Sequence, residues 1–93
     1  MFENPTIGVL GLGHVGLTTA VGFSELGWRV IGAEDLIEKA NQIRAGVTPF
    51  YEPGLKDQLN SALCSGKFEI ALNVRSAIEN SDVIFVCVGT PQN

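Results

Sequence analysis

Three closely spaced glycines stand where an apolar run of the sequence gives way to a helical pattern. Residues 6–10 form the short apolar run, and Gly11, Gly13 and Gly16 follow it directly. Over residues 15–26 the sequence has the period of an amphipathic helix. The face of this helix that we expect to be buried contains Val15, Thr18, Thr19, Gly22, Phe23 and Leu26. The glycines therefore mark a tight connection from a buried strand to a helix.

The rest of the chain continues this alternation of strands and helices. Gly27 and Gly46 follow the first two predicted helices, where glycine commonly ends a helix, and the second helix is expected to bury Ile37, Ala40 and Ile43. The later predicted elements are a strand at 29–33, a helix at 37–45, a loop at 47–54, a helix at 55–65, a strand at 68–72, a helix at 74–79 and a strand at 82–88. Such alternation indicates an α/β fold, with about four parallel strands and flanking helices.

The spacing of the glycines, G-x-G-x-x-G, has a physical reason. The first glycine permits the sharp turn from strand to helix, the second leaves space for a pyrophosphate beside the backbone, and the third lets the helix pack closely on the strand. The amino end of the helix then offers free N–H groups and a partial positive charge to an anion. Between a strand and a helix, this pattern indicates a Rossmann-type turn that binds a dinucleotide.

An acidic residue ends the second predicted strand. Glu34 lies 18 positions after Gly16, near the spacing expected of the residue that binds the adenosine ribose. A carboxylate at this place accepts hydrogen bonds from both ribose hydroxyls and repels a 2′-phosphate, so the sequence favours NAD over NADP. Asp35 competes for the same role, because a strand end predicted from sequence can shift by a residue or two.

Composition argues against several other classes of function. The chain has ten acidic and six basic residues, for a net charge of −4, and the bases are scattered, so nucleic-acid binding is not expected. No apolar run approaches the ~20 residues that span a bilayer, and the first residues lack the order of a signal peptide. Cys64 and Cys87 lack metal-ligand spacing, so we expect free thiols, no metal site and a reduced, cytoplasmic setting.

Longer motifs accompany the glycine turn and the acid. The most specific are the loop Tyr51-Glu52-Pro53-Gly54-Leu55 and the strand end Val88-Gly89-Thr90-Pro91. Further motifs are Gly11-Leu12-Gly13-His14-Val15-Gly16-Leu17, Glu25-Leu26-Gly27 and Val30-Ile31-Gly32. On these residues the chain resembles the N-terminal NAD-binding domain of the UDP-glucose/GDP-mannose dehydrogenase family. Its loop is most similar to that of UDP-glucose 6-dehydrogenases.

The resemblance implies which residues contact the cofactor. Glu34 stands where the family usually has aspartate, and Lys39 where a basic residue is usual near the adenosine ribose, although Lys39 equally suits a solvated helix surface. His14 replaces the usual tyrosine, and we assign it no proton transfer. Glu52 either touches the substrate or organises its turn, and we favour the second role. The residues expected to bind NAD are Gly11, Leu12, Gly13, His14, Val15, Gly16, Glu34, Lys39, Val88, Gly89, Thr90 and Pro91.

The resemblance also implies the chemistry of a parent protein. Members of the family oxidise the C6 alcohol of a sugar nucleotide to a carboxylate with two NAD, and they rely on a cysteine nucleophile further along the chain. Neither Cys64 nor Cys87 has that motif, so we predict no catalytic residue here and an inactive isolated chain. The expected parent is a cytoplasmic homo-oligomer of nucleotide-sugar metabolism and polysaccharide biosynthesis. It would bind its UDP-sugar through a downstream domain.

We therefore expect residues 1–93 to be the N-terminal part of one NAD-binding domain, without its remaining strands, central helix and substrate domain. The apolar run at 82–88 supports this expectation, because the fourth strand of the usual order 3-2-1-4-5-6 is central and paired on both sides. Charged residues make up 17% of the chain, a low share that suits a surface covered by more protein.

Two other functions share the glycines and the acid. One is a regulatory module that senses a dinucleotide without chemistry, and the other is the first half of a hydroxyacid or hydroxyacyl dehydrogenase. Neither has a reason to carry residues 52–55 or 89–91 as this chain has them. The sequence leaves open which sugar nucleotide is used and how many subunits assemble.

Overall fold

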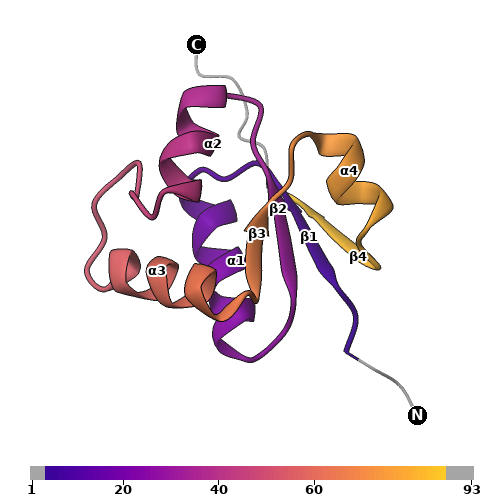
Figure 1. Ribbon diagram of the computed structural model, residues 1–93, viewed down its shortest axis with the longest axis horizontal. Helices are drawn as coiled ribbons and strands as arrows, with labels where there is room; N and C mark the ends of the chain where they lie inside the picture. Colours follow the sequence, from indigo (N-terminus) through magenta and orange to yellow (C-terminus); the bar gives the residue numbers. More distant parts are fainter. Residues whose placement is uncertain (1–3, 88–93) are drawn as a thin grey trace.

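The computed structural model describes residues 4–87, which form a single parallel sheet with helices on both faces (Figure 1). The strands lie in the order β3-β2-β1-β4. Their bounds are β1 Ile7–Leu10, β2 Val30–Ala33, β3 Phe68–Ile70 and β4 Val83–Val86. This arrangement confirms the predicted α/β class, and its strand order matches the first four strands of the doubly wound order 3-2-1-4-5-6.

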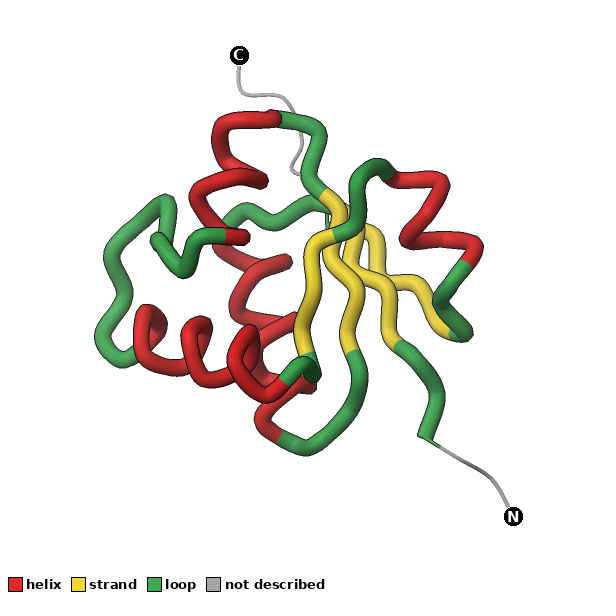
Figure 2. The backbone as a smooth tube through the Cα atoms, viewed as in Figure 1, coloured by secondary structure: helices red, strands yellow, loops and turns green. Residues whose placement is uncertain are grey.

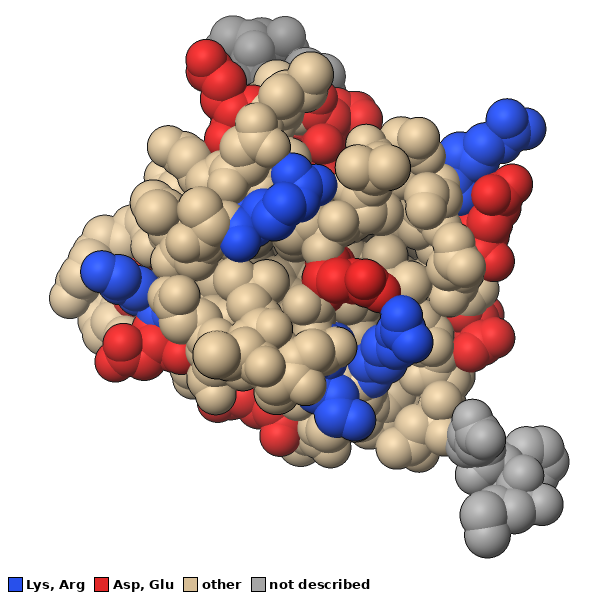
Figure 3. Space-filling model, in the orientation of Figure 1, with Lys and Arg blue, Asp and Glu red and all other residues tan. Residues whose placement is uncertain are grey.

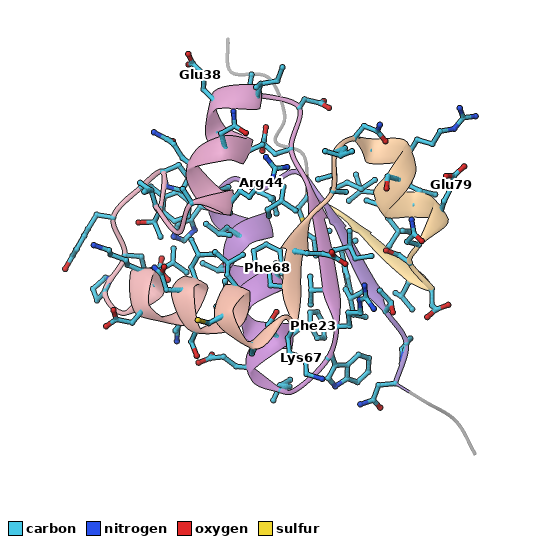
Figure 4. The ribbon with its side chains drawn as sticks, in the orientation of Figure 1. Phe23, Glu38, Arg44, Lys67, Phe68 and Glu79 are labelled. Atoms are coloured by element: carbon cyan, nitrogen blue, oxygen red, sulfur yellow. The ribbon has the colours of Figure 1, made fainter. Side chains whose placement is uncertain are left out.

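The helices divide unequally between the two faces of the sheet. Their bounds are α1 His14–Glu25, α2 Ile37–Arg44, α3 Leu55–Ser65 and α4 Val74–Glu79. Figure 2 shows α1, α2 and α3 on one side of the strands and α4 on the other. Strand pleating matches this division, because Val30 packs in the larger core beneath α1 and α3 while Ile31 and Ala33 pack with Ala77 of α4. Phe68 of β3 is buried in the larger core (Figure 4).

The buried face of α1 differs from the predicted one. Val15 and Leu26 are 64% and 73% exposed. The residues buried from this helix are Gly16, Leu17, Ala20, Val21 and Ser24. Both sets have helical spacing, so periodicity alone could not choose between them. The contact of Gly16 with the backbone of Gly11 makes the choice, because it turns the Gly16 side of the helix toward the sheet.

The second helix shows the same kind of difference at its first residue. Ile37 was expected in the core but is exposed, whereas Ala40 and Ile43 are buried as predicted. Ile37 begins α2 beyond the carboxyl end of β2 and, together with Leu36, lines a cavity at that edge of the sheet. The glycine expected to end α1 does so, since Gly27 has a φ of +93° that a side chain would disfavour.

β4 forms one edge of the sheet within the described residues. It pairs in parallel with β1, from Ile7 opposite Val83 to Leu10 opposite Val86. Val83, Phe85 and Val86 are exposed, although the ring of Phe85 stacks on Phe23 of α1 at a centroid distance of 5.4 Å. Within the described residues, this apolar strand is therefore paired on one side and open on the other.

Charges are dispersed over the surface. In Figure 3 acidic and basic groups alternate across the visible face, and the bases do not gather into a patch. None of the helices within residues 4–87 is both long enough and apolar enough to cross a membrane.

Candidate functional site

We call residues 11–16 the glycine turn. This turn and the carboxyl ends of β1, β2 and β4 surround one cavity of about 420 Å³. The carboxyl edge is where open parallel sheets bind their ligands. The cavity is lined by Gly11, Gly13, His14, Val15, Glu34, Lys39 and Cys87. Six of these residues come from the set predicted from the sequence to contact a cofactor. Cys87 does not, although its position directly after a strand that ends at this edge was a signal for it.

The turn leaves space where the second glycine stands. Gly11 has a φ of +94°, and its N–H donates to the carbonyl oxygen of Ala33 at 2.8 Å, which ties β1 to β2 at the mouth of the cavity. A Cβ on Gly16 would lie 1.8 Å from the carbonyl oxygen of Gly11, whereas a Cβ on Gly13 would meet nothing within 4 Å. The third glycine thus serves packing, and the second faces open space suited to a pyrophosphate.

The amino end of α1 opens onto the same cavity. Gly13 is the N-cap residue and no side chain caps the helix. Unpaired N–H groups and the helix dipole make such an end favourable for a phosphate. The structure therefore fits a dinucleotide at this turn. The open space at Gly13 can hold a pyrophosphate, and the uncapped amino end of α1 offers N–H donors to it.

Glu34 connects the end of β2 to the glycine turn. Its carboxylate accepts hydrogen bonds from the N–H groups of Leu12 at 2.9 Å and Leu36 at 3.1 Å, and the Nζ atom of Lys39 lies 3.5 Å away. Burial raises the pKa of Glu34, but the two backbone donors and the charge of Lys39 outweigh it, so this pKa lies below its ordinary value. The side chain is therefore an ionised acceptor at neutral pH.

Of the two acidic residues that competed for the ribose role, Glu34 is the one that lines the cavity of the glycine turn. Asp35 is exposed and lines the adjoining cavity of about 530 Å³, which also contains Leu36, Ile37 and Pro49. The geometry thus favours Glu34, a choice that alternation along the strand could not make.

The loop at 47–54 packs against the start of α1. The Nε2 atom of His14 contacts the carboxylate of Glu52, and its ring lies 4.9 Å from the ring of Phe50 between centroids. Glu52 therefore connects this loop to the first turn of the helix, in keeping with the organising role favoured from the sequence. His14 is exposed at the rim of the cavity, and its contact with Glu52 holds the loop beside the first turn of α1.

Two groups of predicted residues have a different status. The side chain of Leu12 is fully buried in the core, so this residue meets Glu34 through its backbone N–H. Val88, Gly89, Thr90 and Pro91 lie outside the described residues, and the prediction for them stays a prediction. Their neighbour Cys87 donates its N–H to the carbonyl oxygen of Leu10 at 2.7 Å.

Within residues 4–87, no group of three or more His, Cys, Asp or Glu side chains is placed to hold a metal ion.

A parallel sheet in this order, with a glycine turn at its carboxyl edge and an acid after the second strand, defines a dinucleotide-binding α/β domain. The chain belongs to the UDP-glucose/GDP-mannose dehydrogenase family: residues 5–93 match the model of that family's NAD binding domain. This match confirms the family that the motifs indicated and establishes NAD as the cofactor class.

Individual relatives agree with the family match. The chain is 35% identical over 86 residues to UDP-glucose 6-dehydrogenase YwqF of Bacillus subtilis, covering 92% of this chain and 20% of that protein. It is similar to the solved structure of a UDP-glucose dehydrogenase from Pyrobaculum islandicum, with a TM-score of 0.93, 41% identity and coverage of 98% and 21%. A ternary complex of GDP-mannose dehydrogenase from Pseudomonas aeruginosa has a TM-score of 0.88, 37% identity and coverage of 94% and 20%.

The chain spans about a fifth of the length of the relatives that it matches. What the family match establishes here is accordingly the cofactor-binding domain, and the activity of a whole protein is a matter of proposal.

Proposed function

We propose that this chain supplies the adenosine and pyrophosphate part of the NAD site of a sugar-nucleotide 6-dehydrogenase. The reaction is the oxidation of UDP-glucose, or a related UDP- or GDP-sugar, to the uronic acid with two NAD. The observation that carries the proposal is the hydrogen bond from the Leu12 N–H to the Glu34 carboxylate. It joins an acceptor suited to a ribose to a turn suited to a pyrophosphate, within a single cavity.

Each residue of the cavity has a distinct part in this proposal. Gly13 keeps the backbone open to the pyrophosphate, and the N–H groups at the start of α1 donate to it. Glu34 accepts hydrogen bonds from the ribose hydroxyls, with Lys39 beside it. The remaining proposed cofactor contacts are Gly11, Leu12, His14, Val15, Gly16, Val88, Gly89, Thr90 and Pro91. Bound NAD supplies the hydride acceptor, and this chain holds it in place.

Substrate recognition and bond making belong to other parts of the proposed protein. Cys64 is exposed on α3 and Cys87 follows β4, and we assign the nucleophile to neither. UDP-glucose is the first substrate to test, because of the likeness of the loop motif at 51–55 to that of UDP-glucose 6-dehydrogenases. We propose further that the protein is cytoplasmic and assembles as a homo-oligomer.

The proposal is tested by two alanine substitutions in the protein that carries this chain. A Cβ at Gly13 or at Gly22 meets nothing within 4 Å, so both variants should fold, but only Gly13 faces the proposed pyrophosphate. We expect Gly13→Ala to weaken NAD binding by about tenfold or more in a calorimetric titration, which is ~1.4 kcal/mol. Gly22→Ala should leave NAD affinity unchanged.

The same protein should form NADH when UDP-glucose and NAD are supplied together. Equal NAD affinity of the Gly13→Ala and Gly22→Ala proteins would contradict the assignment of the glycine turn. NAD binding without NADH formation from any UDP- or GDP-sugar would contradict the assigned reaction and leave a dinucleotide sensor as the better description.

A further inference from the structure

His14 and Glu52 form a contact between two segments that lie far apart in the chain. The loop at 47–54 connects α2 to α3 (Figure 1), and His14 is the first residue of α1. The Nε2 atom of His14 contacts the Glu52 carboxylate, and its ring lies 4.9 Å from the ring of Phe50 between centroids. Phe50 itself packs against the larger core. The loop is therefore anchored at Phe50, and Glu52 links it to the glycine turn.

This contact joins two groups whose combined charge changes near neutral pH. Histidine is the side chain that ordinarily gains or loses a charge between about pH 5 and 8. With His14 protonated, the two side chains form an ion pair without net charge. With His14 neutral, its Nε2–H can still donate to the carboxylate, but the pair then carries one negative charge. The two side chains are 62% and 37% exposed, so His14 can exchange protons with water.

The change of charge takes place beside the proposed site of the pyrophosphate. His14 lines the cavity of the glycine turn, at the amino end of α1 where the proposed function places that group. A negative charge on the pair opposes a pyrophosphate, which is itself negatively charged. NAD should accordingly bind more tightly when His14 is protonated. By linkage, its affinity then falls as the pH rises through the titration of His14.

We propose that His14 and Glu52 form a pH-sensitive switch, in which protonation of His14 strengthens the hold on the loop at 47–54 and the binding of a dinucleotide. The inference rests on the proposed function, and it extends it by making the occupancy of the NAD site depend on pH. Tyrosine, the residue that the resemblance leads us to expect at this position, carries no charge near neutral pH and could not act in this way.

Other charged and titratable groups face the same cavity. Lys39 lines it from α2, Glu34 from the end of β2 and Cys87 from the end of β4. Glu34 is ionised at neutral pH and lies 3.5 Å from Lys39, so these two opposite charges offset one another at His14. The amino end of α1 opposes a positive charge on His14, whereas Glu52 favours it. Since a thiol ordinarily keeps its proton up to about pH 8, Cys87 should not change charge in the range that matters for His14.

The test is calorimetry of NAD binding in the protein that carries this chain, between about pH 5.5 and 7.5. The unaltered protein should lose affinity about threefold over this range, the size expected for one charge at a partly exposed site, and should take up protons when NAD binds. His14→Gln keeps a donor for Glu52 but cannot titrate, so it should largely lose both effects. His14→Tyr should behave in the same way.

Two carboxylate variants separate the pair from His14 alone. Glu52→Gln removes the charge that favours protonation of His14, so the fall in NAD affinity should move to lower pH. Glu25→Gln removes an exposed carboxylate from the last residue of α1, outside the cavity, and should leave the pH dependence unchanged. Thermal melts across the pH range identify any variant that fails to fold.

Hydrogen exchange tests the switch without the cofactor. At about pH 6 and without NAD, the amides of the loop at 47–54 should exchange faster in Glu52→Gln than in Glu25→Gln, because the first variant lacks the ion pair. Equal exchange rates in the two variants would show that Glu52 does not hold the loop, and the inference would be wrong.

The outcomes separate the inference from the proposed function. If the unaltered protein binds NAD and the His14→Gln variant has the same pH dependence and proton uptake, the inference is wrong and the proposed function stands. If the unaltered protein does not bind NAD at any pH in this range, both are overturned.

Discussion

At the scale of single residues, the glycines of the turn have separate physical roles. Gly16 has no room for a side chain because its missing Cβ would collide with the carbonyl oxygen of Gly11. Gly13 has room within the protein, so its lack of a side chain matters for what binds there. Glu34 complements them, since its carboxylate receives the N–H of Leu12 from within the turn.

This division of roles predicts different effects on stability for two similar substitutions. Gly16→Ala should destabilise the fold by about 1–3 kcal/mol, because the backbone of the turn must move to admit the methyl group. For a domain of this size each 1 kcal/mol lowers the melting temperature by about 4–8 °C. Gly13→Ala should melt close to the unaltered protein. Melting curves followed by circular dichroism check both, and a Gly16→Ala protein of unchanged stability would contradict the packing described for α1.

At the scale of elements, β4 is the strand whose surroundings are least complete within the described residues. It pairs with β1 alone and exposes Val83, Phe85 and Val86. An open, apolar strand edge offers N–H and C=O groups to any other chain that can pair with it. In the proposed parent protein, we expect a further strand to cover this edge.

The 93-residue chain on its own should therefore associate in solution. Light scattering should give a mass above its 9.9 kDa. Val86→Lys should lower that mass toward the monomer, because lysine on an edge strand opposes pairing. Leu72→Lys changes an apolar residue that is even more exposed and lies away from β4, and it should have no such effect. A monomeric unaltered chain would show that the exposure of β4 has little consequence.

The elements themselves were largely predictable from the sequence, and the reasons are local. Gly27 ends α1 as expected, and α4 has the bounds predicted for it. Helix-ending glycines and the spacing of apolar residues are signals that act within a few residues of the chain. The buried face of α1 was predicted wrongly, since it depends on the contact between Gly16 and Gly11 across the turn. Tertiary contacts of this kind leave no periodic mark in the sequence.

The candidate site was predictable to the same extent. The glycines and an acid after β2 could be found from spacing, but the choice of Glu34 over Asp35 needed the position of the Leu12 N–H. The place of Cys87 in the cavity, and the contact of His14 with Glu52, arise from segments far apart in the chain. The spacing of residues within one segment cannot predict contacts between distant segments.

At the scale of the whole molecule, the layers of the fold position the site. Three helices cover one face of the sheet and α4 covers the other (Figure 2). The turn after β1, the acid after β2 and the end of β4 meet at that edge. The strand order matches the first four strands of a doubly wound fold, and the family match identifies an NAD-binding domain.

The most direct test of this account is a crystal structure of the protein that carries this chain with NAD bound. We predict that the adenosine ribose hydroxyls lie within hydrogen-bonding distance of the Glu34 carboxylate, about 2.5–3.0 Å between oxygens. The pyrophosphate should lie against Gly13 at the amino end of α1. A ribose held by Asp35 instead, or a pyrophosphate away from the glycine turn, would contradict the site described for this chain.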